Sequence, residues 1–242
     1  RSTKNDIVRI FGSDERKIEV IYEGAELPKT TSDADAVLAR HGVATGEYLL
    51  FLGTIEPRKN IIAAIHAFVH AAKRSWLPER ADFVIAGGRG WKDRPVFDAI
   101  GMANRELGDR RERVRYVGYV PHAEKHALVS SAGAFIFPSF YEGFGLPVLE
   151  AMAAGVPVIA SDTEALAEVC GEAALLVAPT DEEGFAHAIH AVWNEHGVAD
   201  RLRRLGRERA AAFTWSKTAR ETIAAYERAV GARLDARGHD VA

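Results

Sequence analysis

The chain has 242 residues, of which 48% are hydrophobic and 27% are charged, a composition typical of a globular protein with a core. Its formal net charge of -3 argues against the basic surface of nucleic-acid-binding proteins, so we expect no nucleic-acid partner. The single cysteine, Cys170, excludes an intrachain disulfide, is predicted as a small core residue, and favours a reducing compartment, the cytoplasm.

The N-terminal part of the sequence begins with a polar helical pattern. KIEVIYEGAEL follows at 17–27 and predicts a strand. A polar segment, PKTTSDADAVLARHG, comes next at 28–42. Its DAD run at 33–35 is interpreted as a helix cap rather than a metal site, because it stands at a helix start and not at a strand end.

Six short runs between residues 47 and 179 are nearly continuous in apolar residues rather than alternating. Such runs are typical of strands that are covered on both faces, as in a parallel sheet. The runs are EYLLFLG at 47–53, ADFVIAGG at 81–88, RVRYVGYV at 113–120, GAFIFPS at 133–139, GVPVIAS at 155–161 and AALLVAP at 173–179. Helical patterns separate them, and this alternation predicts an open, doubly wound, parallel α/β sheet of the Rossmann type.

Two of the later helical patterns carry further predictions. Thr180 and Glu183 have the spacing of a capping box for the helix that follows the sixth strand. The last pattern, FTWSKTARETIAAYERAVGARLDARG, places Ile223, Tyr226 and Val230 on one face. We therefore expect a long amphipathic helix near the C-terminus.

Glycines and charged residues stand at the ends of the predicted strands, where ligands bind in open α/β folds. Gly53, Gly87 and Gly88 end the first two runs, where they let a ligand approach the backbone closely. Lys59 follows near the start of a helix. Because the free N–H groups of a helix start add positive potential, this lysine predicts a phosphate-binding position.

The stretch FPSFYEGFGLPVLE, at 137–150, contains two glutamates, Glu142 and Glu150, with seven residues between them. Pro147 is favoured in the first turn of a helix, so Glu142 precedes a helix that carries Glu150 about one turn along. Carboxylates in that arrangement are too far apart to share one proton or one metal ion, whereas each can accept hydrogen bonds from a diol. An anion can bind between them, at the N–H groups of Phe144, Gly145 and Leu146. The pattern favours a diphosphate flanked by two polyols.

These motifs resemble the C-terminal, nucleotide-sugar-binding half of retaining GT-B glycosyltransferases of family 4, the glycosyl transferases group 1. The resemblance extends from about residue 17 to about residue 230, and its most specific part is the pair of glutamates in their EGFGLP context. It is carried by FLGTIEPRKN, VIAGGRGW, VRYVGYVP, FPSFYEGFGLPVLEAMAAGVPVIAS, EVCGEAALLVAP and FTWSKTARETIAAYERA. The fold that it implies is the C-terminal domain of a GT-B enzyme.

The resemblance implies a role for each glutamate. Glu150 is expected to bind the ribose hydroxyls of a nucleotide-sugar donor. Glu142 is expected to contact the transferred sugar and to stabilise positive charge at its anomeric carbon. The backbone N–H groups of Phe144, Gly145 and Leu146 are expected to donate hydrogen bonds to the sugar and the phosphates.

The phosphate end departs from the family pattern. The family often has arginine directly after the glycine of the first loop, but here Thr54 follows Gly53. Lys59 is similar to the family's diphosphate lysine, and Arg58 either supplies the missing positive charge or is a structural ion-pair residue. The predicted catalytic residues are thus Glu142, Lys59 and Arg58. The family's base-packing positions are occupied by Tyr119 and Val120.

The resemblance also divides the chain. It assigns 1–27 to the end of an N-terminal acceptor domain, 28–46 to a linker, 47–212 to the donor-binding domain and 213–242 to a helix that crosses back toward the acceptor domain. Because the family's acceptor site and catalytic histidine lie in the N-terminal domain, we expect this chain alone to be inactive. Peripheral association with the inner face of a membrane is expected only through that absent domain.

The sequence therefore predicts retaining, metal-independent transfer of a hexose from a nucleoside-diphosphate sugar to a glycan or lipid-linked acceptor, without a cofactor. The first loop, GTIEPRKN, favours GDP-mannose by family similarity and leaves UDP-sugars open. The alternative is a nucleotide-sugar-binding module without transferase activity. The histidine pairs His66/His70 and His122/His126 have no third ligand nearby in the sequence, so no metal site is predicted.

Overall fold

The computed structural model describes residues 1–25, 33–108 and 111–238. Its centre is a six-stranded sheet in the order β3-β2-β1-β4-β5-β6, in which every neighbouring pair of strands is parallel. The strands are β1 (Tyr48–Leu52), β2 (Asp82–Ala86), β3 (Val114–Gly118), β4 (Ala134–Phe137), β5 (Val158–Ser161) and β6 (Ala174–Val177). Each lies within one of the six apolar runs, so the predicted Rossmann-like sheet is confirmed.

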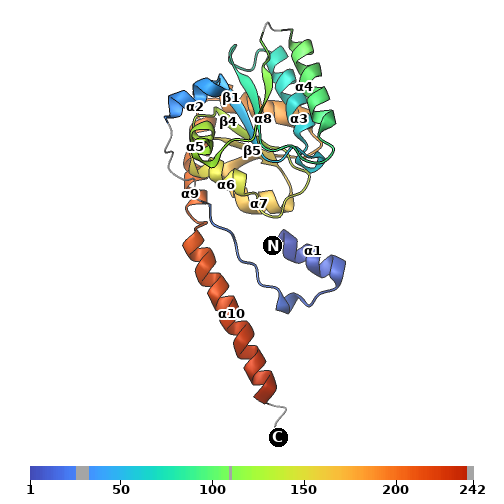
Figure 1. Cartoon of the computed structure of the whole chain (residues 1–242), viewed down its shortest axis with the longest axis vertical. Helices are drawn as coiled ribbons and strands as arrows, with labels where there is room; N and C mark the ends of the chain where they lie inside the picture. Colours follow the sequence, from blue (N-terminus) through green and yellow to red (C-terminus); the bar gives the residue numbers. More distant parts are fainter. Residues whose placement is uncertain (26–32, 109–110, 239–242) are drawn as a thin grey trace.

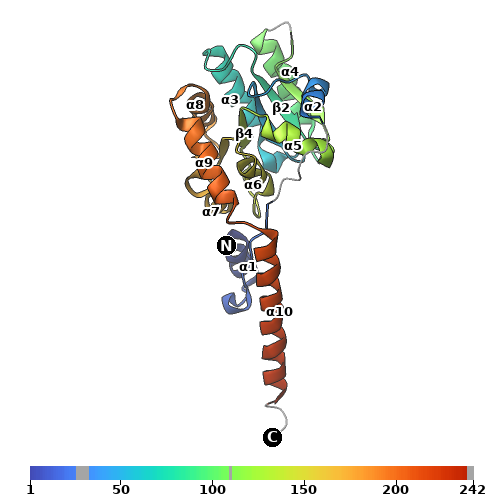
Figure 2. The same cartoon turned by 90° about the vertical axis from the view of Figure 1, so that its left-hand side faces the viewer.

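Helices cover both faces of the sheet. On one side, α3 (Ile61–Lys73) packs against α4 (Arg94–Leu107) and α8 (Glu182–Asn194). Figures 1 and 2 show α3 and α4 across the strands from α2 (Ala34–His41) and α5 (His122–Ser130), which pack on each other. The remaining helices are α1 (Ser2–Phe11), α6 (Leu146–Ala153), α7 (Glu164–Cys170), α9 (Val198–Ala210) and α10 (Trp215–Gly238), with short 3-10 helices η1 (Glu15–Lys17), η2 (Pro57–Lys59) and η3 (Gly171–Ala173).

The strands form the core, as their apolar runs indicate. Phe51, Phe135 and Phe137 are fully buried, and the Phe137 ring centroid lies 5.9 Å from that of Phe51 and 6.0 Å from that of Phe135. Burial of each such ring contributes roughly 1.5–3 kcal/mol. Cys170 is fully buried as well, and burial raises the pKa of its thiol to about 12, which confirms it as a protonated core residue.

The prediction of a strand at 17–27 is wrong for the residues that the structure describes. After η1, residues 18–25 run extended beside α10 instead of joining the sheet (Figure 1). The Thr218 hydroxyl of α10 donates a hydrogen bond to the Tyr22 carbonyl at 2.7 Å. The Tyr22 ring stacks on Phe144 at 6.1 Å. Tyr22 thus packs in an aromatic cluster with Phe144 and Phe213, and its carbonyl bonds to α10, so these contacts hold the segment away from the sheet.

The expected C-terminal helix is confirmed as α10, which leads away from the sheet (Figure 2). Ile223, Tyr226 and Val230 are exposed along it. Within the described part of the chain, no helix combines the length and the apolar character that crossing a bilayer requires. The first part of the predicted linker, within 26–32, lies outside the described residues.

Two predicted helix starts differ in outcome. Asp33 caps α2 by accepting a bond from Asp35 N–H at 3.0 Å, as the DAD run predicts. The predicted capping box at Thr180 is wrong, because Asp181 is the residue before α8 and accepts a bond from Gly184 N–H at 2.8 Å. The N-cap thus lies one residue later than predicted, so the capped N–H group is that of Gly184 and not that of Glu183.

Candidate functional site

The loops after β1 and β2 are joined by backbone hydrogen bonds beyond the ends of the strands. Gly53 N–H donates to the Ala86 carbonyl at 3.0 Å, and Ile55 N–H donates to the Gly88 carbonyl at 2.9 Å. Gly87 has a φ of 140°, and a Cβ there would lie 1.9 Å from the Gly53 carbonyl oxygen. A Cβ at Gly88 would meet no atom within 4 Å. Chain packing therefore requires the first of these paired glycines, whereas the second faces open space.

A cavity of about 300 Å³, here named the glycine cavity, opens at these loops. It is lined by Leu52, Gly53, Thr54, Gly87, Gly88, Tyr119, Val120, His122, Lys125 and Pro147. Six of these are predicted site residues, so the structure brings together the loops after β1, β2 and β3 as the sequence indicates. Tyr119 is 74% exposed at the rim, whereas Val120 is buried.

Glu142 lies at the centre of a charged cluster, here named the Glu142 cluster. Lys59 Nζ lies 2.7 Å from Glu142 Oε1, and Arg58 Nη1 lies 3.0 Å from Glu142 Oε2. Lys59 and Glu142 are only 7% and 8% exposed. A buried charge is stable only when it is paired, and here each oxygen of the carboxylate faces one cation.

Arg58 is fixed on two further sides. Its Nη2 lies 2.6 Å from Glu56 Oε1, and its Nη1 donates to the Tyr141 carbonyl at 2.8 Å. Partial burial lowers the pKa of Arg58, but Glu142 and Glu56 outweigh it, so the pKa is raised overall. The guanidinium is therefore charged and held beside the same carboxylate as Lys59.

Asn60 positions the loop that carries both cations. Its φ of 52° is left-handed, a conformation that asparagine tolerates better than most residues. Its side-chain amide donates to the Pro138 carbonyl at 3.0 Å and to the Pro179 carbonyl at 2.7 Å. Phe140 N–H also donates to the Arg58 carbonyl at 2.9 Å. The loops after β1, β4 and β6 are thus tied together.

The helix α6 begins where the sequence predicts. Gly145 precedes it with a φ of 106°, and Pro147 stands in its first turn. The first intrahelical bond is donated by Val148 N–H to the Gly145 carbonyl at 3.0 Å. The N–H groups of the residues before Val148 therefore stand at the positive end of the helix, where an anion is stabilised.

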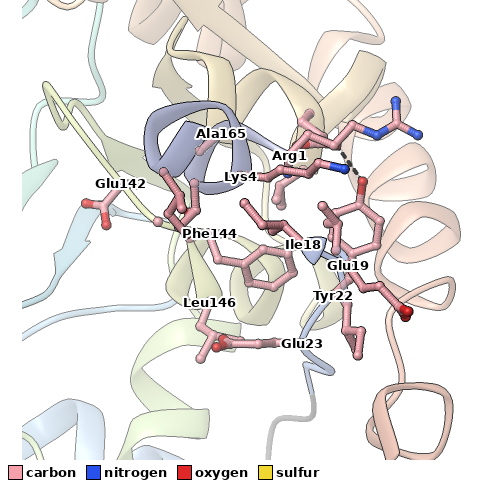
Figure 3. Close-up of a pocket in the computed structure, with 18 of the residues that line it drawn as sticks. Arg1, Lys4, Ile18, Glu19, Tyr22, Glu23, Glu142, Phe144, Leu146 and Ala165 are labelled. Carbon is pink, nitrogen blue, oxygen red and sulfur yellow. Dashed lines mark hydrogen bonds and ion pairs between the residues drawn. The ribbon is translucent and has the colours of Figure 1, made fainter. Parts of the chain in front are cut away.

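A second cavity, of about 530 Å³ and here named the N-terminal cavity, lies between α6, α7 and the N-terminal residues. Its lining includes the predicted site residues Glu142, Phe144, Gly145 and Leu146. In Figure 3 the Phe144 ring faces Ile18 and Tyr22, while the Glu142 carboxylate points away from them. Pro147 lines both cavities, so the start of α6 separates them.

Glu150 has a different partner, which the sequence analysis did not identify. Lys125 Nζ lies 2.6 Å from Glu150 Oε1 and 2.5 Å from Oε2. The two side chains are 19% and 15% exposed, respectively. The sequence feature that could have indicated this pair is the position of Lys125 in PHAEKH, in the first turns of the helix after the third strand. Lys125 lines the glycine cavity, so it connects Glu150 with that cavity. Glu142 lines the N-terminal cavity, so it connects Lys59 and Arg58 with that one.

The two glutamates therefore have separate cations. Among the described residues, no group of three or more His, Cys, Asp and Glu side chains is placed to hold a metal ion. The arrangement can hold an anion at the start of α6 and bind hydroxyl groups on either side of it.

The chain is similar to known glycosyltransferases. A family model described as Glycosyl transferases group 1 matches residues 46–195. The chain is 33% identical over 233 residues to the O-antigen chain mannosyltransferase B of Escherichia coli, which covers 93% of this chain and 58% of that protein. It is 32% identical over 232 residues to a D-inositol 3-phosphate glycosyltransferase of Nocardia farcinica, with coverages of 93% and 50%.

Among solved structures, the sucrose-phosphate synthase of Thermosynechococcus elongatus is similar over 96% of this chain and 57% of that one. The TM-score is 0.76 and the sequence identity is 28%. The chain spans about half the length of the curated relatives that it matches.

Proposed function

This chain belongs to the glycosyl transferases group 1 family, and from that premise we propose that it is the donor-binding half of a retaining, metal-independent hexosyltransferase. The observation that carries the proposal is the placement of the two glutamates. Glu142 pairs with Lys59 and Arg58 and lines one cavity, whereas Glu150 pairs with Lys125, which lines the other, and the start of α6 lies between the two cavities. A nucleoside-diphosphate sugar has the matching order of groups, a diol, a diphosphate and a second polyol.

We assign the nucleoside to the glycine cavity. The base packs on Tyr119 and Val120, and the ribose hydroxyls bind Glu150. The diphosphate follows the backbone at Gly53, Thr54, Gly87 and Gly88. What supports this assignment is that these loops line one cavity and that Gly88 faces open space.

We assign the transferred sugar to the edge of the N-terminal cavity. Glu142 contacts it, and the N–H groups of Phe144, Gly145 and Leu146 bind the sugar and the phosphates. The support is that all four residues line that cavity and that the first intrahelical bond of α6 begins beyond them.

The chemical step releases a nucleoside diphosphate, on which negative charge develops. Lys59, Arg58 and the start of α6 stabilise that charge, in the place that a metal ion takes in other phosphate-transferring sites. Glu142 stabilises the positive charge that develops at the anomeric carbon. Arg58 supplies the positive charge that Thr54 lacks. It lies beside Lys59, because both side chains contact the Glu142 carboxylate.

The sugar and the acceptor are proposed from a similar protein. The relative from E. coli is named a mannosyltransferase of the O-antigen chain, which favours mannose, a GDP-linked donor and a growing glycan or lipid-linked acceptor. The acceptor site and any membrane contact belong to an N-terminal domain that the family resemblance implies. A cytoplasmic location rests on the single cysteine.

Calorimetry with GDP, UDP, GDP-mannose and UDP-glucose tests the donor site directly. We expect saturable binding of at least one nucleoside diphosphate and of its sugar, and transfer by a chain that also carries the acceptor domain. Binding without transfer by that longer chain would favour the alternative, a nucleotide-sugar-binding module. If none of the four ligands binds, both functions are wrong.

A further inference from the structure

We infer that Lys125 is a positioning residue of the donor site, which holds the Glu150 carboxylate oriented for the ribose. This inference rests on the proposed function, because it names a further residue of the same site. Lys125 lies in α5, which follows β3, and Glu150 lies in α6, which follows β4. The ion pair therefore connects two helices.

The contact has the geometry of an orienting clamp. The single ammonium group lies 2.6 and 2.5 Å from the two carboxylate oxygens, so it faces the carboxylate between them and restricts its rotation. Next to Lys125, Glu124 pairs with Arg40 of α2 at 2.9 Å, and α2 packs on α5. The carboxylate thus has a fixed orientation before any ligand arrives.

The clamp leaves capacity for a ligand. An ionised carboxylate has about four lone-pair sites, and Lys125 Nζ donates a hydrogen bond to Oε1, whereas Oε2 lies at ion-pair distance without a hydrogen-bond partner. The remaining sites can accept the two hydroxyls of a ribose. Without the cation, a carboxylate that is only 15% exposed would be a poorly compensated buried charge.

The position of Lys125 separates this pair from an ordinary surface ion pair. Lys125 lines the glycine cavity together with Tyr119 and Val120, so its effect falls where the nucleoside is proposed to bind. Lys73 and Glu106 form a comparison pair at 2.8 Å, with side chains 56% and 53% exposed. Those exposed residues lie outside the glycine cavity, and such a pair contributes little.

The test compares ribonucleotides with 2′,3′-dideoxyribonucleotides in the whole chain. The unchanged protein should bind GDP or UDP more tightly than the matching dideoxynucleotide, because Glu150 binds the missing hydroxyls. In Lys125→Met we expect binding of the ribonucleotide to weaken about 10-fold, the effect of one weakened charge-assisted hydrogen bond. Binding of the dideoxynucleotide should change little, so the preference for ribose is lost.

Three controls separate positioning from general structural damage. Lys125→Arg keeps a cation and should retain most of the preference, whereas Lys73→Met should retain all of it. Lys125→Met combined with Glu150→Gln should bind no more weakly than Glu150→Gln alone, because the two residues act as one unit. Lys125→Gln provides the same comparison if the methionine variant does not fold.

The outcomes distinguish this inference from the proposed function. An unchanged ribose preference in Lys125→Met, or equal weakening of both nucleotides, would overturn the role of Lys125 alone. Absence of GDP and UDP binding by the unchanged protein would overturn the proposed function and the inference with it.

Discussion

The wall of the site that follows β1 and β2 is held by backbone hydrogen bonds and close glycine contacts, whereas the wall around α6 is held by ion pairs. In the first wall the chain itself forms the surface, so a substitution at a packed glycine disturbs the fold and the cavity together. In the second wall, charged side chains form the surface. Their contributions to stability and to ligand binding can therefore be separated by substitution.

Lys59→Met should have the largest effect, because it removes a cation from the Glu142 cluster. We expect affinity for the nucleoside diphosphate to fall about 100-fold, since a charge-assisted phosphate contact is lost. The free energy of unfolding should fall by about 3 kcal/mol, because Glu142 keeps only one of its cations. Calorimetry and denaturant unfolding measure the two effects.

A compensating variant tests whether the two effects of Lys59→Met are separable. Lys59→Met combined with Glu142→Leu removes the uncompensated charge and should regain most of the unfolding free energy without regaining nucleotide affinity. Recovery of both quantities together would show that the charged wall has no ligand-binding role of its own.

Gly87→Ala tests the backbone wall. Its Cβ would lie 1.9 Å from the Gly53 carbonyl oxygen, and its φ of 140° is strained for alanine, so we expect a loss of about 2–3 kcal/mol in unfolding free energy. Gly88→Ala is the matched control, because its Cβ meets open space. It should keep the stability and weaken nucleotide binding. Equal stability losses in both variants would contradict the packing argument.

Glu150→Ala and Glu142→Ala test the two ends of the charged wall separately. Glu150→Ala should weaken binding of the free nucleoside diphosphate and of the nucleotide sugar by a similar factor, about 10-fold, because both ligands carry the ribose. Glu142→Ala should weaken chiefly binding of the nucleotide sugar and its turnover. Equal effects of the two changes on the free nucleotide would refute the separate roles.

Arg58→Gln should have the smallest effect on nucleotide binding. The Arg58 side chain is 38% exposed, so solvent screens its charge, and we expect affinity to fall about 3-fold to 5-fold. Titration at low and at high salt checks the prediction, since the difference from the unchanged protein should shrink as salt increases. A loss as large as that of Lys59→Met would assign the diphosphate to Arg58 instead.

The sheet was predictable because each strand is an almost continuous apolar run, and a parallel strand that is covered on both faces has few other possible environments. The segment at 17–27 has a similar composition, but its environment is set by Phe144 and α10, which lie far away in the sequence. Local pattern alone does not distinguish an extended segment beside a helix from a strand.

The site was predictable where one residue type in a local motif has one role, as for the two glutamates and the glycines. Lys125 was missed because its partner is 25 residues away, and a lysine in a helix carries no local mark of a buried ion pair. The division of the site into two cavities also depends on contacts between distant segments. Spacing within a single motif does not contain that information.

Asn60 has a consequence for the motions of the site. With one side-chain amide bonded to the Pro138 and Pro179 carbonyls, the loops after β1, β4 and β6 lose their separate freedom when the chain folds. Little backbone entropy then remains to be lost when a ligand binds. We therefore expect the three loops to open as one unit, so that a ligand held by any one of them should slow hydrogen exchange in all three.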